Sequence, residues 1–309
     1  MTRAMIVDIA SAYSFHQLGE RANQEDSRYP DTDTLDIHTP VYVVCDGVGG
    51  SDKGEVASST VCKSIGEFLM SHKNTDRFTD EDFSEVLQYA YSGLNKVSDA
   101  TNRGMGTTMT FLLFHTGGAL AAHIGDSRIY QIRPNEGIMY RSEDHSLVNA
   151  LLRSGNITPE EVKNHPQSNI ITRCMSADDG TRQQDDATVV NLRDIAPDDY
   201  FLLCTDGVTG MVEDEELIEL YSSDKTDEEK RDILAEKCRS SSDNNTAIQI
   251  RVGMVTVDVE PETEEETSES DQSRVETQKI PNKDDSVHEL SARTEKQSKI
   301  ISFIKNLFK

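Results

Sequence analysis

Two continuous apolar runs predict strands that are buried on both faces. Residues 41–45 read VYVVC and end at Asp46, which is followed by a glycine-rich stretch at residues 47–50. Residues 200–205 repeat this arrangement and end at Asp206. Continuous runs of β-branched and aromatic residues are typical of strands covered on both sides. Each strand therefore delivers an aspartate to a turn in which glycine lets a ligand approach the backbone.

The rest of the hydrophobic pattern predicts an α+β fold. Strands are expected between turn residues, at residues 5–15, 107–114, 119–124, 127–133, 138–141, 187–192 and 246–259, the last with a kink at Gly253. Helices are expected where apolar residues recur every three or four positions, at residues 54–70, 83–97 after a cap at Thr79 or Asp80, 146–153, 159–161, 214–221 and 227–238. Strands come in runs and helices in pairs, which favours antiparallel sheets packed on each other with helices outside.

The composition changes after residue 259, which we take as the end of the folded domain, residues 1–259. Residues 260–298 are acidic, rich in Ser and Thr and poor in large apolar residues. We expect them to form a disordered linker, because too little surface can be buried to offset chain entropy. Residues 299–309 predict an amphipathic helix. Three interpretations of that helix stay open: a peripheral membrane contact, a partner or self-docking site, and a frayed end.

Charge and cysteine content exclude several classes of protein. The formal net charge is −25, so the main body should repel nucleic acids and anionic membranes. The five cysteines form no C-x-x-C pair, which indicates reduced packing thiols of a cytosolic protein and not a disulfide frame or a zinc site. We find no apolar run of bilayer length and no leader-like start. The expected location is therefore the cytoplasm, with peripheral membrane contact open for residues 299–309.

Four aspartates lie at predicted strand boundaries: Asp46, Asp126, Asp206 and Asp243. A single Asp-Gly or Asp-Ser pair is an ordinary turn former. Four carboxylates at four strand ends, without clustered His or Cys, together form a donor set that suits Mg²⁺ or Mn²⁺.

An ordered set of motifs resembles the bacterial branch of the metal-dependent type 2C protein serine/threonine phosphatases. Over about residues 8–257 the motifs are GERANQEDS, VVCDGVGG, GTTMTFLLF, AHIGDSRIY, DHS, HPQSNIITR, LLCTDGV and SDNNT. The resemblance implies a central β-sandwich of two antiparallel sheets flanked by helices, in four αββα layers. It also implies a dinuclear metal centre in the cleft between the sheets.

The resemblance assigns metal ligands by motif. Asp46 is similar to the aspartate that bridges both cations, and Gly47 to the glycine whose carbonyl binds one of them. Asp206 and Asp243 match further carboxylate ligands, and Asp126 with Asp206 resembles the site of a third, looser cation. The implied cofactors are thus two Mn²⁺ or Mg²⁺ ions per active site, with a third at Asp126.

The resemblance also implies the reaction. Glu25 and Asp26 match an acidic pair that holds metal-bound waters, and Arg21 matches an arginine that grips the substrate phosphate. A water bridging two cations loses its proton near neutral pH and can attack phosphorus directly. The implied activity is hydrolysis of phosphoserine and phosphothreonine on phosphorylated protein substrates, opposing a cognate serine/threonine kinase.

The chain departs from the family pattern at two places. Val48 stands where some relatives carry a histidine that could protonate the leaving alkoxide, so His123 and His145 become candidates by sequence proximity, although a lone histidine is more often structural. Residues 176–186 replace the usual small-residue ending of their motif, so the loop near the cleft should differ.

Other functions would require different sequence features. A phosphocysteine mechanism lacks the C-x5-R spacing. A non-catalytic sensor or scaffold with the same fold stays open, but retention of the acidic residues argues against it. A metal phosphoesterase for small phosphates also stays open, since pocket contacts in residues 146–186 would decide the substrate.

Overall fold

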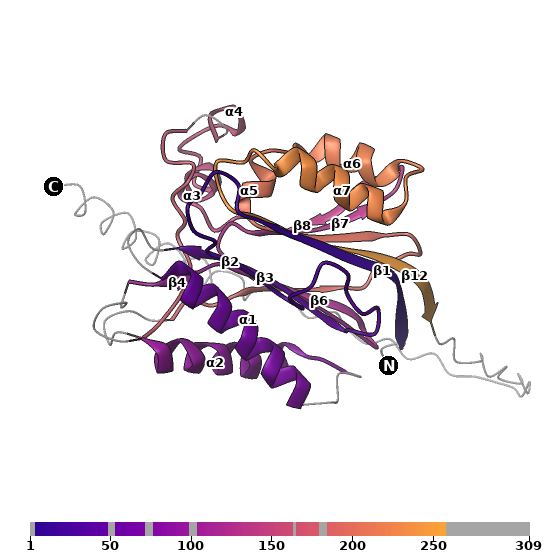
Figure 1. Ribbon diagram of the computed structural model, residues 1–309, viewed down its shortest axis with the longest axis horizontal. Coiled ribbons are helices and arrows are strands. Elements are labelled where there is room, and N and C mark those ends of the chain that lie inside the picture. The colour runs from indigo at the N-terminus through magenta and orange to yellow at the C-terminus, as the bar shows by residue number, and fades with distance from the viewer. Residues whose placement is uncertain are drawn as a thin grey trace, which may run out of the picture. The chain divides into compact units, whose positions relative to one another are not determined.

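The secondary structure of the protein forms four layers, seen edge-on in Figure 1. The computed structural model describes residues 4–48, 53–71, 77–98, 104–162, 165–178 and 184–257. The chain divides into one unit of residues 1–260, which holds all described elements, and a second of residues 261–309. Within the first unit two antiparallel sheets pack face to face, with helices over both outer faces. The predicted α+β class and αββα layering are confirmed.

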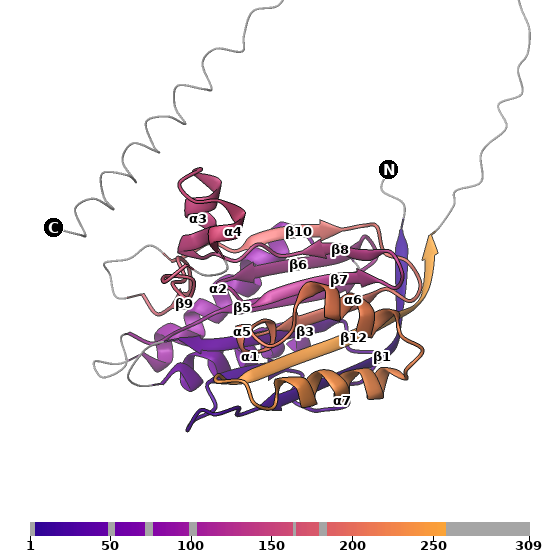
Figure 2. The same ribbon diagram turned by 90° about the horizontal axis from the view of Figure 1, so that it is seen from above.

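One sheet has five strands and carries helices on its outer face. Its order is β1 (Met5–Gln17), β12 (Asn245–Val257), β11 (Tyr200–Cys204), β7 (Arg128–Arg133) and β8 (Gly137–Arg141). Helices α6 (Asp214–Ser222) and α7 (Asp227–Cys238) cover it, after the short helix α5 (Asp206–Thr209) (Figure 2). The β1–β12 register shifts on either side of Ile9, opposite residues 252–255, so the irregularity lies at the predicted kink at Gly253.

The second sheet has seven strands and packs against the paired helices α1 (Gly54–Ser71) and α2 (Asp80–Val97). Its order is β10 (Thr188–Leu192), β6 (Gly118–Ile124), β5 (Met109–His115), β3 (Val41–Val48), β4 (Gly106–Thr107) and β9 (Met175–Ser176), with β2 (Asp26–Tyr29) also paired to β3. Short helices α3 (Leu147–Arg153) and α4 (Pro159–Val162) follow β8. Thr79 caps α2 in a reciprocal capping box with Asp82, one of the two predicted caps.

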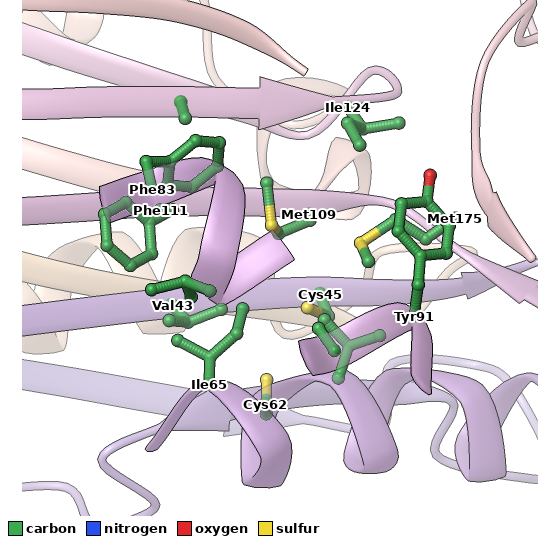
Figure 3. Close-up of a cluster of buried hydrophobic side chains, with 14 of the residues drawn as sticks. Val43, Cys45, Cys62, Ile65, Phe83, Tyr91, Met109, Phe111, Ile124 and Met175 are labelled. Atoms are coloured by element: carbon green, nitrogen blue, oxygen red, sulfur yellow. The ribbon is translucent and has the colours of Figure 1, made fainter. Parts of the chain in front are cut away.

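Strand β3 is buried on both faces, as its apolar run predicts. Tyr42 and Val44 belong to the apolar cluster between the sheets. Val43 and Cys45 belong to the cluster beneath α1 and α2, together with Ile65 (Figure 3). Full burial of each such side chain stabilises the fold by roughly 1.5–3 kcal/mol. The strand that ends in the candidate site is therefore anchored from both sides.

Four sequence expectations about local structure were wrong. Asp46 and Gly47 do not lie in a turn after the strand, because β3 continues to Val48 by pairing with the two-residue strand β4. Asp206 opens helix α5 and is not in a simple turn. Residues 26–29, where the hydrophobic pattern predicts no strand, form strand β2 because they pair with β3. The expected strand 107–114 is also divided at Thr108 into β4 and β5.

The predicted linker at residues 260–298 and the predicted helix at residues 299–309 lie outside the described residues. Among the helices that the structure describes, none is both long and apolar enough to cross a membrane.

Candidate active site

A cleft of about 580 Å³ brings together side chains from widely separated parts of the chain. It is lined by Arg21, Glu25, Asp46, Gly47, Val48, Asp126, Asn169, Ile171, Asp206, Asp243 and Asn244. Seven of the eight residues proposed from the sequence are in this lining. The eighth, Asp26, is only 3% exposed and pairs with Asp46 across the β2–β3 ladder.

Hydrogen bonds of the Asp46 backbone to Thr107 and Thr108 fix the position of Asp46. Its N–H donates to the Thr108 hydroxyl oxygen at 2.9 Å, and its carbonyl accepts from the Thr108 N–H at 2.8 Å and from the Thr107 hydroxyl at 2.9 Å. At the break between β4 and β5, the buried hydroxyl of Thr108 therefore points toward the Asp46 amide. Buried backbone groups require such partners.

Gly47 must be glycine because two backbone segments crowd it. A Cβ atom at this position would lie 2.4 Å from the Gly54 carbonyl oxygen and 2.7 Å from the Glu25 carbonyl oxygen. The Gly47 N–H donates to that Glu25 oxygen at 3.0 Å. Close packing thus joins the start of α1, the loop before β2 and the end of β3 at one point.

Asp26 connects the two sheets beneath the cleft. Its Oδ2 accepts from the Thr205 hydroxyl at 3.0 Å, and the same hydroxyl oxygen accepts from the Thr246 N–H at 3.1 Å. Its Oδ1 is buried and has no hydrogen-bond partner among the described residues. An unpartnered buried carboxylate oxygen requires an explanation, and a ligand supplied from outside the chain is one.

The carboxyl groups in and beneath the cleft disfavour one another's charge. Burial, followed by the charges of Asp26 and Asp206, raises the pKa of Asp46 well above its ordinary value. Burial first, and neighbouring aspartates second, raise the pKa of Asp26 and that of Asp126 to about 7. Burial and the charge of Asp243 raise the pKa of Asp206. Such a cluster of oxygens attracts cations.

The donor set fits hard divalent cations. All candidate ligands are oxygens, and Oδ1 of Asp206, like Oδ1 of Asp26, is buried and unpartnered within the described part of the chain. Among the described residues, no three His, Cys, Asp or Glu side chains are already arranged so that together they could hold a metal ion. Mutual repulsion separates carboxylates, and Mg²⁺ and Mn²⁺ sites retain several waters, so an open arrangement is compatible with these ions.

The mouth of the cleft carries an ion pair. Nη2 of Arg21 lies 2.6 Å from Oδ2 of Asp243, and the Arg21 side chain is 56% exposed. Its hydrogen bond with Asp243 raises the pKa of Arg21. The partner of Arg21 is thus the candidate ligand Asp243.

Sequence reasoning missed Asn244, which orients Glu25. Its side-chain oxygen accepts from the Glu25 N–H at 2.8 Å, and its Nδ2 donates to the carbonyls of Leu18 and Asn23 at 2.8 and 3.0 Å. Its place directly after Asp243 was the available signal. Asn169 and Ile171, which line the cleft, and Thr108 were also missed, although they lie within the motifs HPQSNIITR and GTTMTFLLF, because no individual role was assigned to them.

Neither histidine considered as a proton donor lines the cleft. His123 and His145 are 1% and 5% exposed, and their rings stack with centroids 4.5 Å apart. Val48, in contrast, does line the cleft. The position of a proton-donating histidine is thus taken by an apolar side chain, and these two histidines do not replace it.

Comparisons with known proteins agree with this geometry. The family model described as Protein phosphatase 2C matches residues 16–238. The serine/threonine phosphatase Stp of Listeria innocua is 33% identical over 219 residues, which cover 68% of this chain and 84% of that protein. Protein phosphatase PhpP of Streptococcus pneumoniae is 37% identical over 186 residues, 60% of this chain and 73% of that protein. The solved catalytic domain of the phosphatase PstP in complex with two manganese ions has a TM-score of 0.61 at 27% identity, covering 82% of this chain and 100% of that one.

Proposed function

The chain belongs to the protein phosphatase 2C family and is a metal-dependent protein serine/threonine phosphatase, and from this premise we propose how its cleft acts. Asp46, Gly47, Asp206 and Asp243 hold two divalent cations, Mn²⁺ or Mg²⁺. The observation that carries the proposal is the convergence in one cleft of acidic residues from β3 and from the segments that follow β11 and precede β12. Asp126, with Asp206, contributes the site of a third cation.

When bound, the cations lower the pKa of a water molecule for direct attack on phosphorus and neutralise charge on the phosphate. The chain's own residues hold the site in place. Asp46 is rigid because three hydrogen bonds fix its backbone to residues 107–108. Glu25 and Asp26 accept hydrogen bonds from ordered water, Glu25 in the orientation that Asn244 imposes.

Arg21 binds the substrate phosphate. Its guanidinium group is exposed at the cleft mouth and presents a planar fork of donors suited to two phosphate oxygens. Asp243 holds that fork at the edge of the acidic site, 2.6 Å away. A phosphorylated side chain entering the cleft therefore meets one cationic group beside the carboxylates.

The leaving alkoxide takes its proton from solvent or from a cleft carboxyl group. Among the described residues that line the cleft, none is histidine. Burial and the neighbouring Glu55 raise the pKa of Glu25, so its carboxyl group retains a proton at higher pH than an ordinary glutamate. Phosphoester cleavage here should accordingly tolerate substitution of His123 more readily than loss of a cleft acid.

Phosphoproteins are the substrates, and a cognate serine/threonine kinase that produces them is the proposed partner in cytoplasmic signalling. The proposal also includes a peripheral membrane contact through residues 299–309, which lie outside the described residues. Deleting residues 299–309 and measuring both vesicle binding and turnover tests it. Loss of vesicle binding with unchanged turnover would support a membrane contact.

The experiment that tests the proposed reaction is hydrolysis of phosphoserine and phosphothreonine peptides with Mn²⁺ and after exhaustive chelation. In ¹⁸O-labelled water, a single turnover should place one ¹⁸O atom in the released phosphate, as direct attack by water requires. Asp206→Asn should abolish turnover, whereas Asp198→Asn, outside the cleft, should not. Full activity after chelation, or a phosphorylated enzyme intermediate, would contradict the mechanism.

A further inference from the structure

His145 forms hydrogen bonds that hold the turn that carries Asp126. The turn joins β6 to β7, and Gly125 within it has φ +102°, a left-handed conformation that favours glycine. The Gly125 N–H donates to Nδ1 of His145 at 3.2 Å, and the His145 N–H donates to the Gly125 carbonyl at 2.9 Å. Two hydrogen bonds to one residue therefore fix both peptide groups that flank Gly125, the second of which leads directly into Asp126.

The imidazole of His145 is itself held in one orientation. Because Nδ1 accepts from Gly125, Nε2 carries the proton and donates to the Thr188 hydroxyl oxygen at 2.9 Å. The ring stacks on His123, whose Nε2 is fixed by the Glu143 carbonyl at 2.9 Å. Burial, then the neighbouring His123, lowers the pKa of His145 to about 3, which keeps the ring in this neutral form.

The opposite face of the Asp126 turn rests on the residue that fixes Asp46. A Cβ atom on Gly125 would lie 2.6 Å from Cγ2 of Thr108, so the turn is packed between Thr108 and His145. The Thr108 hydroxyl also hydrogen-bonds the Ser127 hydroxyl at 2.7 Å. The packing of this turn between Thr108 and His145 therefore sets the position of Asp126 relative to Asp46.

The backbone of His145 also holds the wall of the cleft. Its carbonyl accepts from the Thr172 N–H at 2.7 Å and from the Thr172 hydroxyl at 2.9 Å. Ser146 forms a β-bridge with Ile171, one of the two wall residues, and the second, Asn169, is two residues further back. One residue thus contacts both the Asp126 turn and the segment that a bound phosphopeptide would touch.

We propose that His145 is a positioning residue that couples cation binding at Asp126 to substrate docking against the wall formed by Asn169 and Ile171. The inference rests on the proposed role of Asp126 in binding a cation. The coupling is mechanical: displacing the Gly125 peptide moves the Asp126 carboxylate, and displacing the His145 backbone moves the wall. Partners of metal-site residues have effects of this kind without touching the ion.

The test compares His145→Leu with His145→Asn. Leucine keeps the bulk of the side chain but removes the acceptor for the Gly125 N–H. The side-chain oxygen of asparagine lies close to the position of Nδ1 and can accept that hydrogen bond. His115→Leu is the matched control, because Nδ1 of His115 accepts from the Gly117 N–H at 3.1 Å at the end of β5 remote from Thr108. Thr172→Val, which removes only the hydroxyl bond to the His145 carbonyl, is a milder probe of the wall.

Two readouts are needed. Free Mn²⁺ counted by electron paramagnetic resonance gives the dissociation constant of the weakest site, and steady-state kinetics on a phosphothreonine peptide give KM and kcat as Mn²⁺ is varied. For His145→Leu we expect the weakest site to lose about tenfold or more in affinity, as for other residues that orient metal ligands, and KM to rise with it. His145→Asn should recover most of both, and His115→Leu should match the wild-type enzyme.

The outcomes separate this inference from the proposed function. If Asp126→Asn binds as many Mn²⁺ ions as the wild type, the role of Asp126 fails, and the coupling fails with it. If Asp126→Asn loses the weak ion while His145→Leu keeps it, only the positioning role of His145 is overturned. Equal losses in His145→Asn and His145→Leu would also overturn it. Should His145→Leu not fold, a KM for Thr172→Val equal to that of the wild type at every Mn²⁺ concentration would overturn the coupling.

Discussion

Asp26 and Asp46 occupy directly opposite positions in the antiparallel β2–β3 ladder. Side chains of opposed residues lie on the same face of a sheet, and like charges in that arrangement destabilise it. Asp26 is buried and Asp46 is partly buried at the cleft, and their removal from water raises the pKa values of both carboxyl groups. An arrangement that weakens the fold in this way is expected at a functional site, where a bound cation compensates the charge.

The first consequence is an unusual dependence of stability on pH in chelated protein. The pKa values of Asp26 and Asp126 are about 7 in the fold against an ordinary 3.8, so the folded state holds more protons than the unfolded state between these values. Their contribution to stability is present below pH 3.8, is lost as pH rises from 3.8 to about 7, and stays absent above that pH. We expect the Tm of EDTA-treated wild-type protein, measured by calorimetry, to fall relative to that of Asp126→Asn as pH rises from about 5 to 7.

The contribution of buried His145 to stability changes with pH in the opposite direction. His145 has a pKa of about 3 against an ordinary 6.5, so its contribution grows up to pH 6.5 and then stays constant. The histidine and carboxyl effects therefore oppose each other below pH 6.5, and the comparison with Asp126→Asn separates them because both proteins keep His145. Saturating Mn²⁺ should remove the difference in pH dependence between the two proteins. An equal pH dependence of Tm in chelated wild type and chelated Asp126→Asn would refute the repulsive cluster.

A second expectation concerns Arg21. Arg21→Lys should lower kcat/KM for phosphopeptides by about tenfold or more, because a lysine ammonium cannot reproduce the planar fork on two phosphate oxygens. Steady-state kinetics measure it. The control is Arg141→Lys: the Arg141–Asp214 ion pair has similar exposure, with side chains 49% and 27% exposed, and neither residue lines the cleft. Equal kinetics for the two variants would exclude Arg21 from phosphate binding.

The Thr108 hydroxyl gives a third expectation. Thr108→Val leaves the buried Asp46 N–H without its acceptor, which should cost about 1–3 kcal/mol in unfolding free energy. Activity should fall by about tenfold or more, since each 1.4 kcal/mol of lost transition-state stabilisation is a factor of ten. Denaturant titration and kinetics together measure both effects.

Thr110→Val is the matched control for Thr108. Both threonines are fully buried, and the Thr110 hydroxyl donates to the Val44 carbonyl at 2.9 Å without contacting Asp46. Its loss should lower stability while leaving the activity of the folded enzyme close to that of the wild type. Parallel losses of activity in the two variants would show that the hydroxyl at Thr108 has no special relation to Asp46.

Gly47 provides a fourth expectation. Gly47→Ala places a Cβ atom against the backbone of residue 54 and of Glu25, so β3 or the start of α1 must move. We expect a fall in Tm of several degrees and weaker Mn²⁺ binding by calorimetric titration. Gly104→Ala, where a Cβ atom meets nothing within 4 Å, should change neither. Normal Mn²⁺ binding by a folded Gly47→Ala protein would argue against close packing as the determinant of the site.

The sequence predicted the long strands and the helices, because strong apolar periodicity decides these elements locally. It also identified the aspartates, since each follows or precedes such an element. Strands β2, β4 and β9 were not predicted as separate strands, because two to four residues carry little periodicity. These strands form only by pairing with distant segments. For the same reason Asp46 was placed in a turn and not in a strand.

The supporting residues of the site could not be predicted in the same way. Thr108, His145 and Asn244 act through hydrogen bonds to residues far away in the chain. A threonine or histidine of this kind has no distinctive neighbours, so only the fold reveals its partner. Arg21 shows the same limit, because its ion pair spans 222 positions to Asp243.

The central claim is that Asp46, Gly47, Asp206 and Asp243 hold two cations in the cleft. Anomalous diffraction from crystals soaked in Mn²⁺, recorded at the manganese edge, tests it most directly. We expect two strong peaks in contact with these residues and a weaker one at Asp126. Catalytically active crystals with no anomalous peak in the cleft, or with manganese bound only elsewhere, would contradict the claim.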